Sequence, residues 1–333
     1  MKIRQRIEER EHEFLSPFAA KSSESRGREI PEVPCEIRTI YQRDRDRILH
    51  TKAFRRLKHK TQVFISPEGD HYRTRLTHTL EVAQISRTIA RALFLNEDLT
   101  EAIALGHDLG HTPFGHTGEN VLNRLHPNGF RHNEHSYRIV DELEQHKGKP
   151  GLNLSFEVKD GILNHTGSNK PATLEGQIVK IADRIAYINH DIDDSLRAGV
   201  LSADQLPTES IQILGETHGQ RLDTLVKDMI ESSMDQSEIK QSAEISLAMK
   251  ELRKFMFQHV YLHSSAKHEE GKAINLLEQL YAYYLKNPLE IPAPYRRSEY
   301  SIHDSVCYFI AGMSDRYALS RFTEIFVPRP WNG

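Results

Sequence analysis

Histidine is concentrated in one part of this sequence, and it is the residue type to consider first for chemistry. The chain has 333 residues, of which 19 are histidines. Six of them fall in a single stretch: His107, His111, His116, His126, His132 and His135. Imidazole binds divalent metal ions and titrates near neutral pH, so this concentration indicates a metal site or a proton-transfer site.

The dipeptide His107-Asp108 closes an apolar helical segment, AIALGHDLG. Adjacent side chains inside a regular helix diverge by about 100°. Irregular backbone at Gly106 or Gly110 would let this imidazole and carboxylate converge on one ion. The pair suits Zn, Mn, Fe, Co or Ni, and carboxylate-rich sites also accept Mg. A helix-end aspartate paired with a nearby base explains the dipeptide equally well.

His78 lies on an apolar helical face. Spacings of four, three and four residues align it with Val82, Ile85 and Ile89. The side chain is therefore expected to point inward. A core histidine with satisfied hydrogen bonds is the alternative to a metal ligand.

Asp183 lies on the clearest helix of the sequence, LEGQIVKIADRIAYINHDIDDSL, opposite its apolar stripe. The same polar side carries Tyr187, His190 and Asp194, with Asp191 at its edge. Such a face is usually solvated. Small residues beside Asp183 and a tyrosine among the acids favour a packed functional face, and both interpretations stay open at this point.

His116 and Glu119 are three residues apart, so a helix that begins near Gly115 would present both on one face. A carboxylate beside a histidine fixes its tautomer and favours the protonated form that donates to a leaving oxygen. The segment therefore predicts an acid/base pair. An ordinary loop between helices is the alternative.

The elements that must position these residues are predicted to be helices, because helical apolar spacing recurs along the chain and period-two alternation is scarce. The fold class is therefore all-α. Helices are expected at 36–61, 74–95, from Thr100 to near Gly110, and at 133–145, 157–165, 174–199, 220–231, 239–262, 267–286 and 302–322, with a turn at 66–70. We expect a partly flexible lead-in at 1–35, a catalytic core at 36–200 and a C-terminal helical part at 201–333 that packs on the core.

Composition and charge set the class of protein. Hydrophobic residues make up 38% and charged residues 27%, and no apolar run reaches the length of a membrane span. We therefore expect a cytoplasmic protein without membrane association. The two cysteines, Cys35 and Cys307, are far apart and are expected to be packing residues.

Nine lysines and arginines between Arg38 and Lys60 indicate either an anionic partner or a salt-bridged helix surface.

Taken in order, His78, His107-Asp108 and Asp183 resemble the H...HD...D signature of the HD-domain phosphohydrolases. More specifically, the chain resembles the deoxynucleoside triphosphate triphosphohydrolases of the dGTPase type. The matching segments are DRDRILHTKAFRRLKHKTQVF (44–64), RTRLTHTLEV (73–82), HDLGHTPFGHTGE (107–119), FRHNEHSYR (130–138) and ADRIAYINHDIDD (182–194).

The resemblance implies an all-α HD fold and a role for each matching residue. His78, His107, Asp108 and Asp183 would bind the divalent metal ion, whose identity stays open among Mg, Mn, Co, Ni, Fe and Zn. His116 and Glu119 would be the catalytic pair. Arg75 and His132 would lie beside the phosphates. The sugar would be contacted by Tyr187, Asp191 and Gln62.

The reaction implied by the resemblance is hydrolysis of a deoxynucleoside triphosphate, dGTP or dNTPs generally, to deoxynucleoside and tripolyphosphate. It also implies a homo-oligomer, with single-stranded DNA or a regulatory nucleotide as further partners. Two alternatives remain: another HD phosphohydrolase, such as a nucleotidase or phosphodiesterase, and a regulatory protein that binds dNTPs or nucleic acid. No GYP triplet follows the HD pair and no Walker-type phosphate loop is present.

Overall fold

The computed structural model describes residues 2–62, 73–261 and 267–329 and confirms the all-α prediction. These residues form 15 α-helices and one two-stranded hairpin. The helices are α1 (Ile3–Phe14), α2 (Ile40–Leu49), α3 (Lys52–Arg56), α4 (Arg75–Ala92), α5 (Glu97–Gly106), α6 (Gly115–Leu125), α7 (His132–Arg138), α8 (Phe156–Asn164), α9 (Leu174–Arg197), α10 (Thr208–Leu214), α11 (His218–Ser233), α12 (Ala243–Met256), α13 (Lys267–Lys286), α14 (Ile302–Ala311) and α15 (Asp315–Phe326). The hairpin pairs β1 (Gln145–His146) with β2 (Lys149–Pro150).

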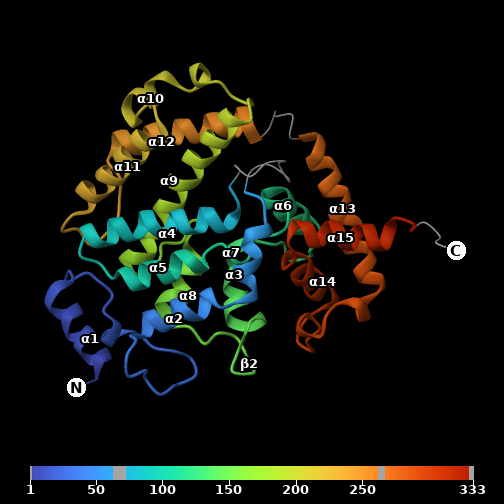
Figure 1. Cartoon of the computed structure of the whole chain (residues 1–333), viewed down its shortest axis with the longest axis horizontal. Helices are drawn as coiled ribbons and strands as arrows, with labels where there is room; N and C mark the ends of the chain where they lie inside the picture. Colours follow the sequence, from blue (N-terminus) through green and yellow to red (C-terminus); the bar gives the residue numbers. More distant parts are fainter. Residues whose placement is uncertain (1, 63–72, 262–266, 330–333) are drawn as a thin grey trace.

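Three mutually packed helices, α4, α5 and α9, form the centre of the molecule (Figure 1). Each begins at a polar N-cap that satisfies a free backbone N–H: Thr74 for α4, Asn96 for α5 and Thr173 for α9. The predicted start of α5 at Thr100 is wrong, because this helix begins at Glu97. The Thr100 hydroxyl donates to the Asn96 carbonyl (2.8 Å) from inside the helix, because Asn96 already accepts from the Leu99 N–H.

Several predicted helices are shorter than the periodicity indicated. The segment 36–61 is divided at Thr51, which caps α3, and the segment 302–322 is divided near Gly312 into α14 and α15. Helix α7 passes into a π-helical turn at Ile139–Leu143 before the hairpin. The lead-in 1–35 contains helix α1. The turn predicted at 66–70 lies outside the described residues.

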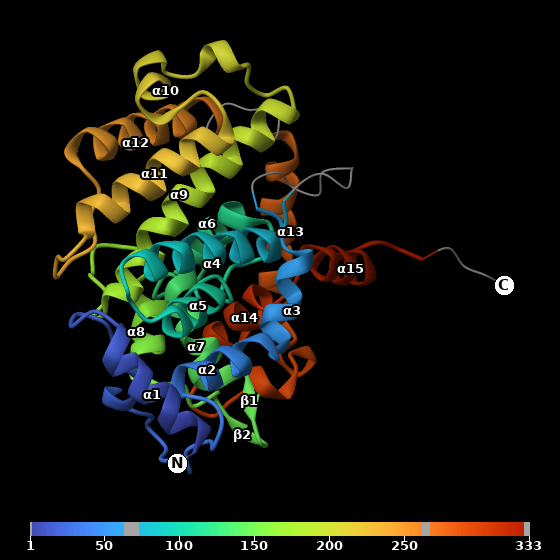
Figure 2. The ribbon, with the colours of Figure 1, turned by 60° about the vertical axis from the view of Figure 1, so that its left-hand side comes forward.

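Apolar side chains gather in two clusters. The larger cluster joins α2, α4, α5, α8 and α9 with α10–α12, which lie together at one end of α9 in both ribbon views (Figures 1 and 2). The smaller cluster joins α6 with α13 and α14. The predicted division of the chain near residue 200 stays a prediction; helices that follow it contribute to both clusters.

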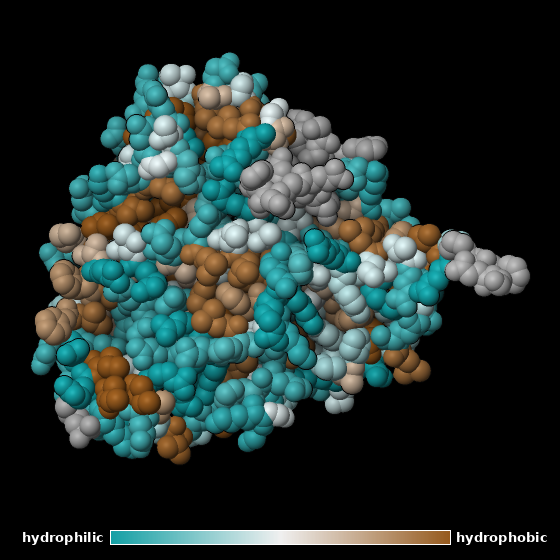
Figure 3. Space-filling model, in the orientation of Figure 1, coloured by the Kyte–Doolittle hydropathy of each residue, from teal (hydrophilic) through white to brown (hydrophobic). Residues whose placement is uncertain are grey.

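The surface is largely hydrophilic on the face seen in Figure 3, with separate apolar patches. Among the described helices, none combines the length and the hydropathy needed to cross a bilayer.

Candidate active site

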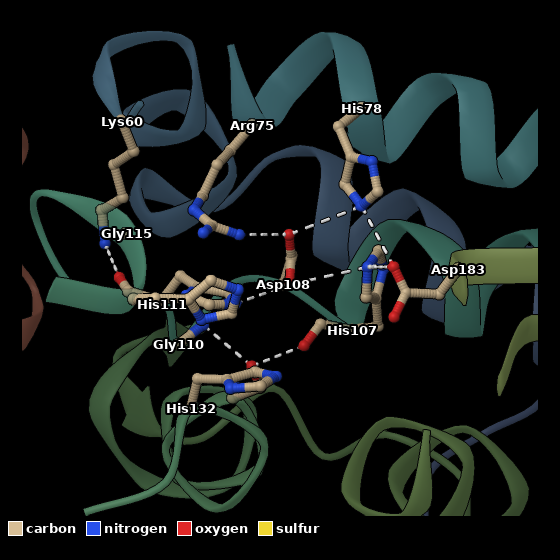
Figure 4. Close-up of polar contacts among 12 residues, drawn as sticks. Lys60, Arg75, His78, His107, Asp108, Gly110, His111, Gly115, His132 and Asp183 are labelled. Atoms are coloured by element: carbon tan, nitrogen blue, oxygen red, sulfur yellow. Dashed lines mark hydrogen bonds and ion pairs between the residues drawn. The ribbon is translucent and has the colours of Figure 1, made fainter. Parts of the chain in front are cut away.

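The four predicted metal ligands meet where α4, the end of α5 and α9 come together (Figure 4). His78 Nε2 lies 3.1 Å from Asp183 Oδ1 and 3.9 Å from Asp108 Oδ2. His107 Nε2 lies 3.6 Å from Asp108 Oδ1 and 3.7 Å from Asp183 Oδ1. Side chains that lie far apart in the sequence therefore converge on one small volume, although no local sequence pattern joins them.

The chemistry of this donor set fits a divalent ion. The ligand atoms of His78, His107 and Asp108 all lie within 4.8 Å of one another, and all three residues are buried. His107 Nδ1 lies 2.6 Å from the Ala104 carbonyl and must donate to it, so Nε2 carries the lone pair. That Nε2 is buried and has no hydrogen-bond partner among the described residues. A buried lone pair without a donor, facing two carboxylates, is the arrangement that a metal ion completes.

The surrounding charges keep both carboxyl groups ionised. Burial alone would raise the pKa of Asp108, but His111, His107 and Arg75 lower it well below its usual value. Burial likewise opposes ionisation of Asp183, and the neighbouring His107 and His78 rings lower its pKa well below the usual range. Both acids are therefore ready to bind a cation without first losing a proton.

The loop after Asp108 is held against α7. The Gly110 N–H donates to the Ser136 hydroxyl (2.8 Å), which in turn donates to the His107 carbonyl (2.7 Å). A Cβ on Gly110 would lie 2.2 Å from the Ser136 backbone nitrogen and 2.4 Å from the His132 carbonyl. Glycine is thus required for this close approach, which fixes the backbone from which His107 and Asp108 project.

A second group of side chains, an arginine and two histidines, lies next to the metal ligands and contacts Asp108. Arg75 is 2% exposed, and its guanidinium donates to Asp108 Oδ2 (2.8 Å). His111 Nε2 lies 3.3 Å from Asp108 Oδ1, and its ring stacks on His132 with 4.0 Å between centroids. Arginine and histidine N–H groups beside a metal site are suited to bind phosphate oxygens.

The predicted catalytic pair is close but not tightly bonded. His116 Nδ1 lies 3.8 Å from Glu119 Oε2, and the His116 side chain is 74% exposed. Glu119 instead accepts from both the backbone N–H (2.8 Å) and the ring Nδ1 (2.9 Å) of His132. Burial would raise the pKa of Glu119, but His132 and His116 lower it far below its usual value. The structure therefore brings Glu119 and His132 together and leaves His116 at the rim.

The predicted sugar-binding residues lie one and two turns beyond Asp183 on α9. Asp191 is buried and Tyr187 is half-buried. Burial raises the pKa of Tyr187 to about 12, and Asp183 and Asp191 add to this shift, so its hydroxyl stays a donor. Gln62 lies near Gly115 and Arg75. A Cβ added to Gly115 would lie 3.2 Å from the Gln62 backbone oxygen and 3.5 Å from the Arg75 guanidinium.

The polar face of α9 is packed, so the interpretation of a solvated face is wrong and that of a functional face stays a prediction. His190, Asp191 and Asp194 are exposed by 1%, 4% and 2%. A face that is polar yet buried indicates a site rather than solvation.

Three buried histidines near the ligands received no role from the sequence. His111 stands four residues after His107, a helical spacing that could have revealed it. His165 ends α8, stacks edge-on against His107, and has its Nε2 3.2 Å from His132 Nε2. His190 contacts His78. No local pattern indicates His165, because the packing of α8 on α5 and α7 brings it to the site.

The basic run between Arg38 and Lys60 divides into two halves. The first half is salt-bridged: Arg38 pairs with Asp46, Arg43 and Arg47 with Glu32, and Arg45 with Asp98 and Glu101. The second half borders a cavity of about 660 Å³, to which Lys52, Arg55, Arg56 and Lys60 contribute. Lys60 is buried there and donates to the carbonyls of His111 and Ala311.

Comparison with known proteins assigns the class and then the family. Residues 75–188 match the family described as HD domain, and residues 239–324 match the one described as phosphohydrolase-associated domain. A solved phosphohydrolase from Bacteroides thetaiotaomicron shares the fold, with a TM-score of 0.54 and 19% identity over 82% of this chain and 66% of that chain. The protein is thus an HD-domain phosphohydrolase.

Curated relatives are more specific. A protein of Caldanaerobacter subterraneus subsp. tengcongensis is 61% identical over 99% of this chain and 98% of its own length. One of Clostridium tetani is 52% identical over 99% and 97%. Both are named deoxyguanosinetriphosphate triphosphohydrolase-like protein. The chain belongs to this family of deoxyguanosinetriphosphate triphosphohydrolase-like proteins.

Proposed function

We propose that the protein hydrolyses deoxynucleoside triphosphates, dGTP or dNTPs generally, to deoxynucleoside and tripolyphosphate. One observation carries the proposal: Asp108 is shared between the metal ligands on one side and Arg75 and His111 on the other. A phosphate chain that lies along these two groups would meet a divalent ion and the guanidinium and imidazole N–H groups together. The names of the relatives support a nucleotide substrate.

The metal, when bound, would supply charge compensation for the phosphate and a water of lowered pKa. The chain's own residues would do the rest. Arg75, locked by its bond to Asp108, would orient the phosphate next to the ion, and His132, held through Nδ1 by Glu119, would present its ring to the phosphate oxygens. His116, at the exposed rim, would donate a proton to the departing 5′-oxygen.

Selection of deoxyribose is assigned to α9. Tyr187 and Asp191 follow the metal ligand Asp183 by one and two turns, so a sugar whose phosphate reaches the ion would extend along this face. A 2′-hydroxyl would find no room or partner there, and the ribonucleotide would be disfavoured.

The deciding experiment is incubation of the metal-loaded chain with each of the four dNTPs, followed by ion-exchange chromatography of the products. We expect deoxynucleoside and tripolyphosphate in equal amounts. Release of orthophosphate, pyrophosphate or a nucleoside monophosphate would refute the proposed reaction and favour another HD phosphohydrolase, a nucleotidase or phosphodiesterase. Metal analysis of the same preparation identifies the native ion among Mg, Mn, Co, Ni, Fe and Zn.

A regulatory partner is the second part of the proposal. The cavity of about 660 Å³ is bordered by Lys52 and Arg55, which have no carboxylate partner among the described residues, and by the buried Lys60. Lys60 also donates to the backbone of His111, which links this cavity to the site. We propose that a regulatory nucleotide or single-stranded DNA binds here, since both present phosphate oxygens.

Arg55→Ala tests this binding site. The variant should weaken activation by added dNTPs or DNA while basal turnover is kept. Unchanged activation would exclude the cavity as the regulatory site.

We also propose that the protein forms a homo-oligomer. Light scattering of the purified chain, with and without dNTPs, tests this.

The remaining candidate function is that of a regulatory protein without catalysis. Salt-sensitive binding of DNA or dNTPs with no turnover in Mg, Mn or Co would establish it.

A further inference from the structure

A second layer of side chains lies behind the metal ligand His78. Its Nδ1, the nitrogen that faces away from Asp108 and Asp183, lies 3.3 Å from Nδ1 of His190. His190 Nε2 lies 2.7 Å from Glu81 Oε2. His190 is 1% exposed, so water cannot stand in for either contact.

With a divalent ion bound at Nε2 of His78, the protons in this layer can be placed in only one way. The Glu81 carboxylate has only acceptors, so His190 must donate to it from Nε2. The neutral His190 then has a lone pair on Nδ1, and it accepts from Nδ1–H of His78. With its Nδ1 used as a donor, His78 turns Nε2 toward Asp183 and the ion.

Glu81 is itself held in place. Burial opposes its ionisation, but its bond to His190 and the charge of Arg73 lower its pKa. Arg73 reaches from Glu81 (3.2 Å) to Asp193 (2.9 Å) and Asp194 (3.0 Å). The layer thus joins α4, which supplies His78, to α9, which supplies Asp183.

The other ligand imidazole obtains the same tautomer differently. His107 donates from Nδ1 to the carbonyl of Ala104 in its own helix turn, which no side-chain substitution removes. His78 depends on side chains alone. Metal-binding histidines are commonly oriented by such outer hydrogen bonds, and loss of the outer partner weakens metal binding.

We propose that His190 and Glu81 are positioning residues that fix the tautomer and ring orientation of His78 and thereby set the affinity for the divalent ion. The inference rests on the metal-binding part of the proposed function and not on the identity of the substrate.

The first test compares His190→Phe with His190→Asn. Phenylalanine fills the volume but cannot accept from His78, whereas the Asn carboxamide oxygen can take the place of Nδ1. Calorimetric titration of Mn²⁺ into the metal-stripped full chain should show affinity weakened by roughly 10- to 100-fold in His190→Phe and largely restored in His190→Asn. Wild-type affinity in His190→Phe would overturn the proposal, and so would equal weakening in both variants.

A matched control is available at His126, a buried histidine whose Nε2 pairs with Asp304 (3.0 Å) far from the ligands. His126→Phe should leave the Mn²⁺ affinity unchanged. Should His190→Phe fail to fold, as judged by circular dichroism, Glu81→Gln takes its place, since this side chain is 39% exposed. We expect several-fold weaker binding, and unchanged binding would overturn the role of Glu81.

The tautomer can also be read directly. In long-range proton–nitrogen NMR spectra of the Zn²⁺-loaded wild type, His78 should be protonated at Nδ1; protonation at Nε2 would contradict the proposal. Neither measurement involves dNTPs. Wild-type protein that binds metal and shows these effects but releases no tripolyphosphate would refute the proposed function and leave the positioning roles intact.

Discussion

The metal-ligand cluster and the proton-transfer group beside it are built in opposite ways. His78, His107 and Asp108 are buried and oriented by fixed partners in three packed helices. His116 stands on the first turn of α6 with 74% of its side chain exposed, 3.8 Å from Glu119. The first group is already assembled in the structure, whereas in the proposed function the second would be aligned by the substrate. Metal binding and turnover should therefore separate on mutation.

Asp183→Ala tests the rigid cluster and should have the largest effect. The Asp183 carboxylate lies beside Nε2 of both His78 and His107. Its removal takes away one ligand and leaves two imidazoles that repel one another whenever both are protonated. We expect loss of bound metal by elemental analysis and loss of turnover below detection. Asp223→Asn changes an exposed acid on α11 that pairs with Lys227; this variant is the control and should behave as wild type. Metal retained in Asp183→Ala would remove it from the ligand set.

His116→Ala tests the exposed group. The protein should keep its metal, because this ring touches none of the four ligands, and kcat should fall by roughly 10²-fold or more if the ring protonates the leaving oxygen. Hydrolysis of a substrate analogue whose leaving group needs no proton, such as the p-nitrophenyl ester of tripolyphosphate, should be slowed much less. His12→Ala, a half-exposed histidine on α1, is the control. An unimpaired rate with dNTPs would exclude the assigned role.

Glu119 and His132 should show coupled, intermediate effects. Glu119 accepts two bonds from His132, and Gln could keep the backbone bond but not the charge. Glu119→Gln and His132→Gln should each lower kcat/KM by roughly tenfold, and the double variant should be little worse than either single one. Additive losses would show that the two residues act separately.

The sequence pointed to four residues that the structure brings together, because their types and order carry the signal; their role as metal ligands stays a prediction. The fold class followed from helical spacing of apolar residues. The irregular backbone predicted beside His107 is not seen, because His107 continues α5 with regular helical angles. The exposed position of His116 did not follow, because spacing places a residue on a helix face without fixing how far it stands from a neighbouring helix.

What the sequence could not give are the contacts made only by packing. His165 comes from α8, and His190 was visible on α9 only as part of a polar face. The pairing of Glu119 with His132 requires α6 and α7 to meet, which is a tertiary event. The division of the segment 302–322 at Gly312 was hidden because the apolar pattern continues across the break.

Tyr187→Phe should have the smallest effect, because it removes one hydroxyl from a half-buried ring whose packing against the apolar core remains. Its raised pKa keeps that hydroxyl protonated through neutral pH, so in the wild type it can donate to a sugar oxygen. Loss of one such bond costs about 1 kcal/mol, or about fivefold in kcat/KM for dGTP. Metal content should stay unchanged, and the preference for dGTP over GTP should narrow. A variant that retains the full preference would move sugar selection away from Tyr187, toward Asp191 or Gln62.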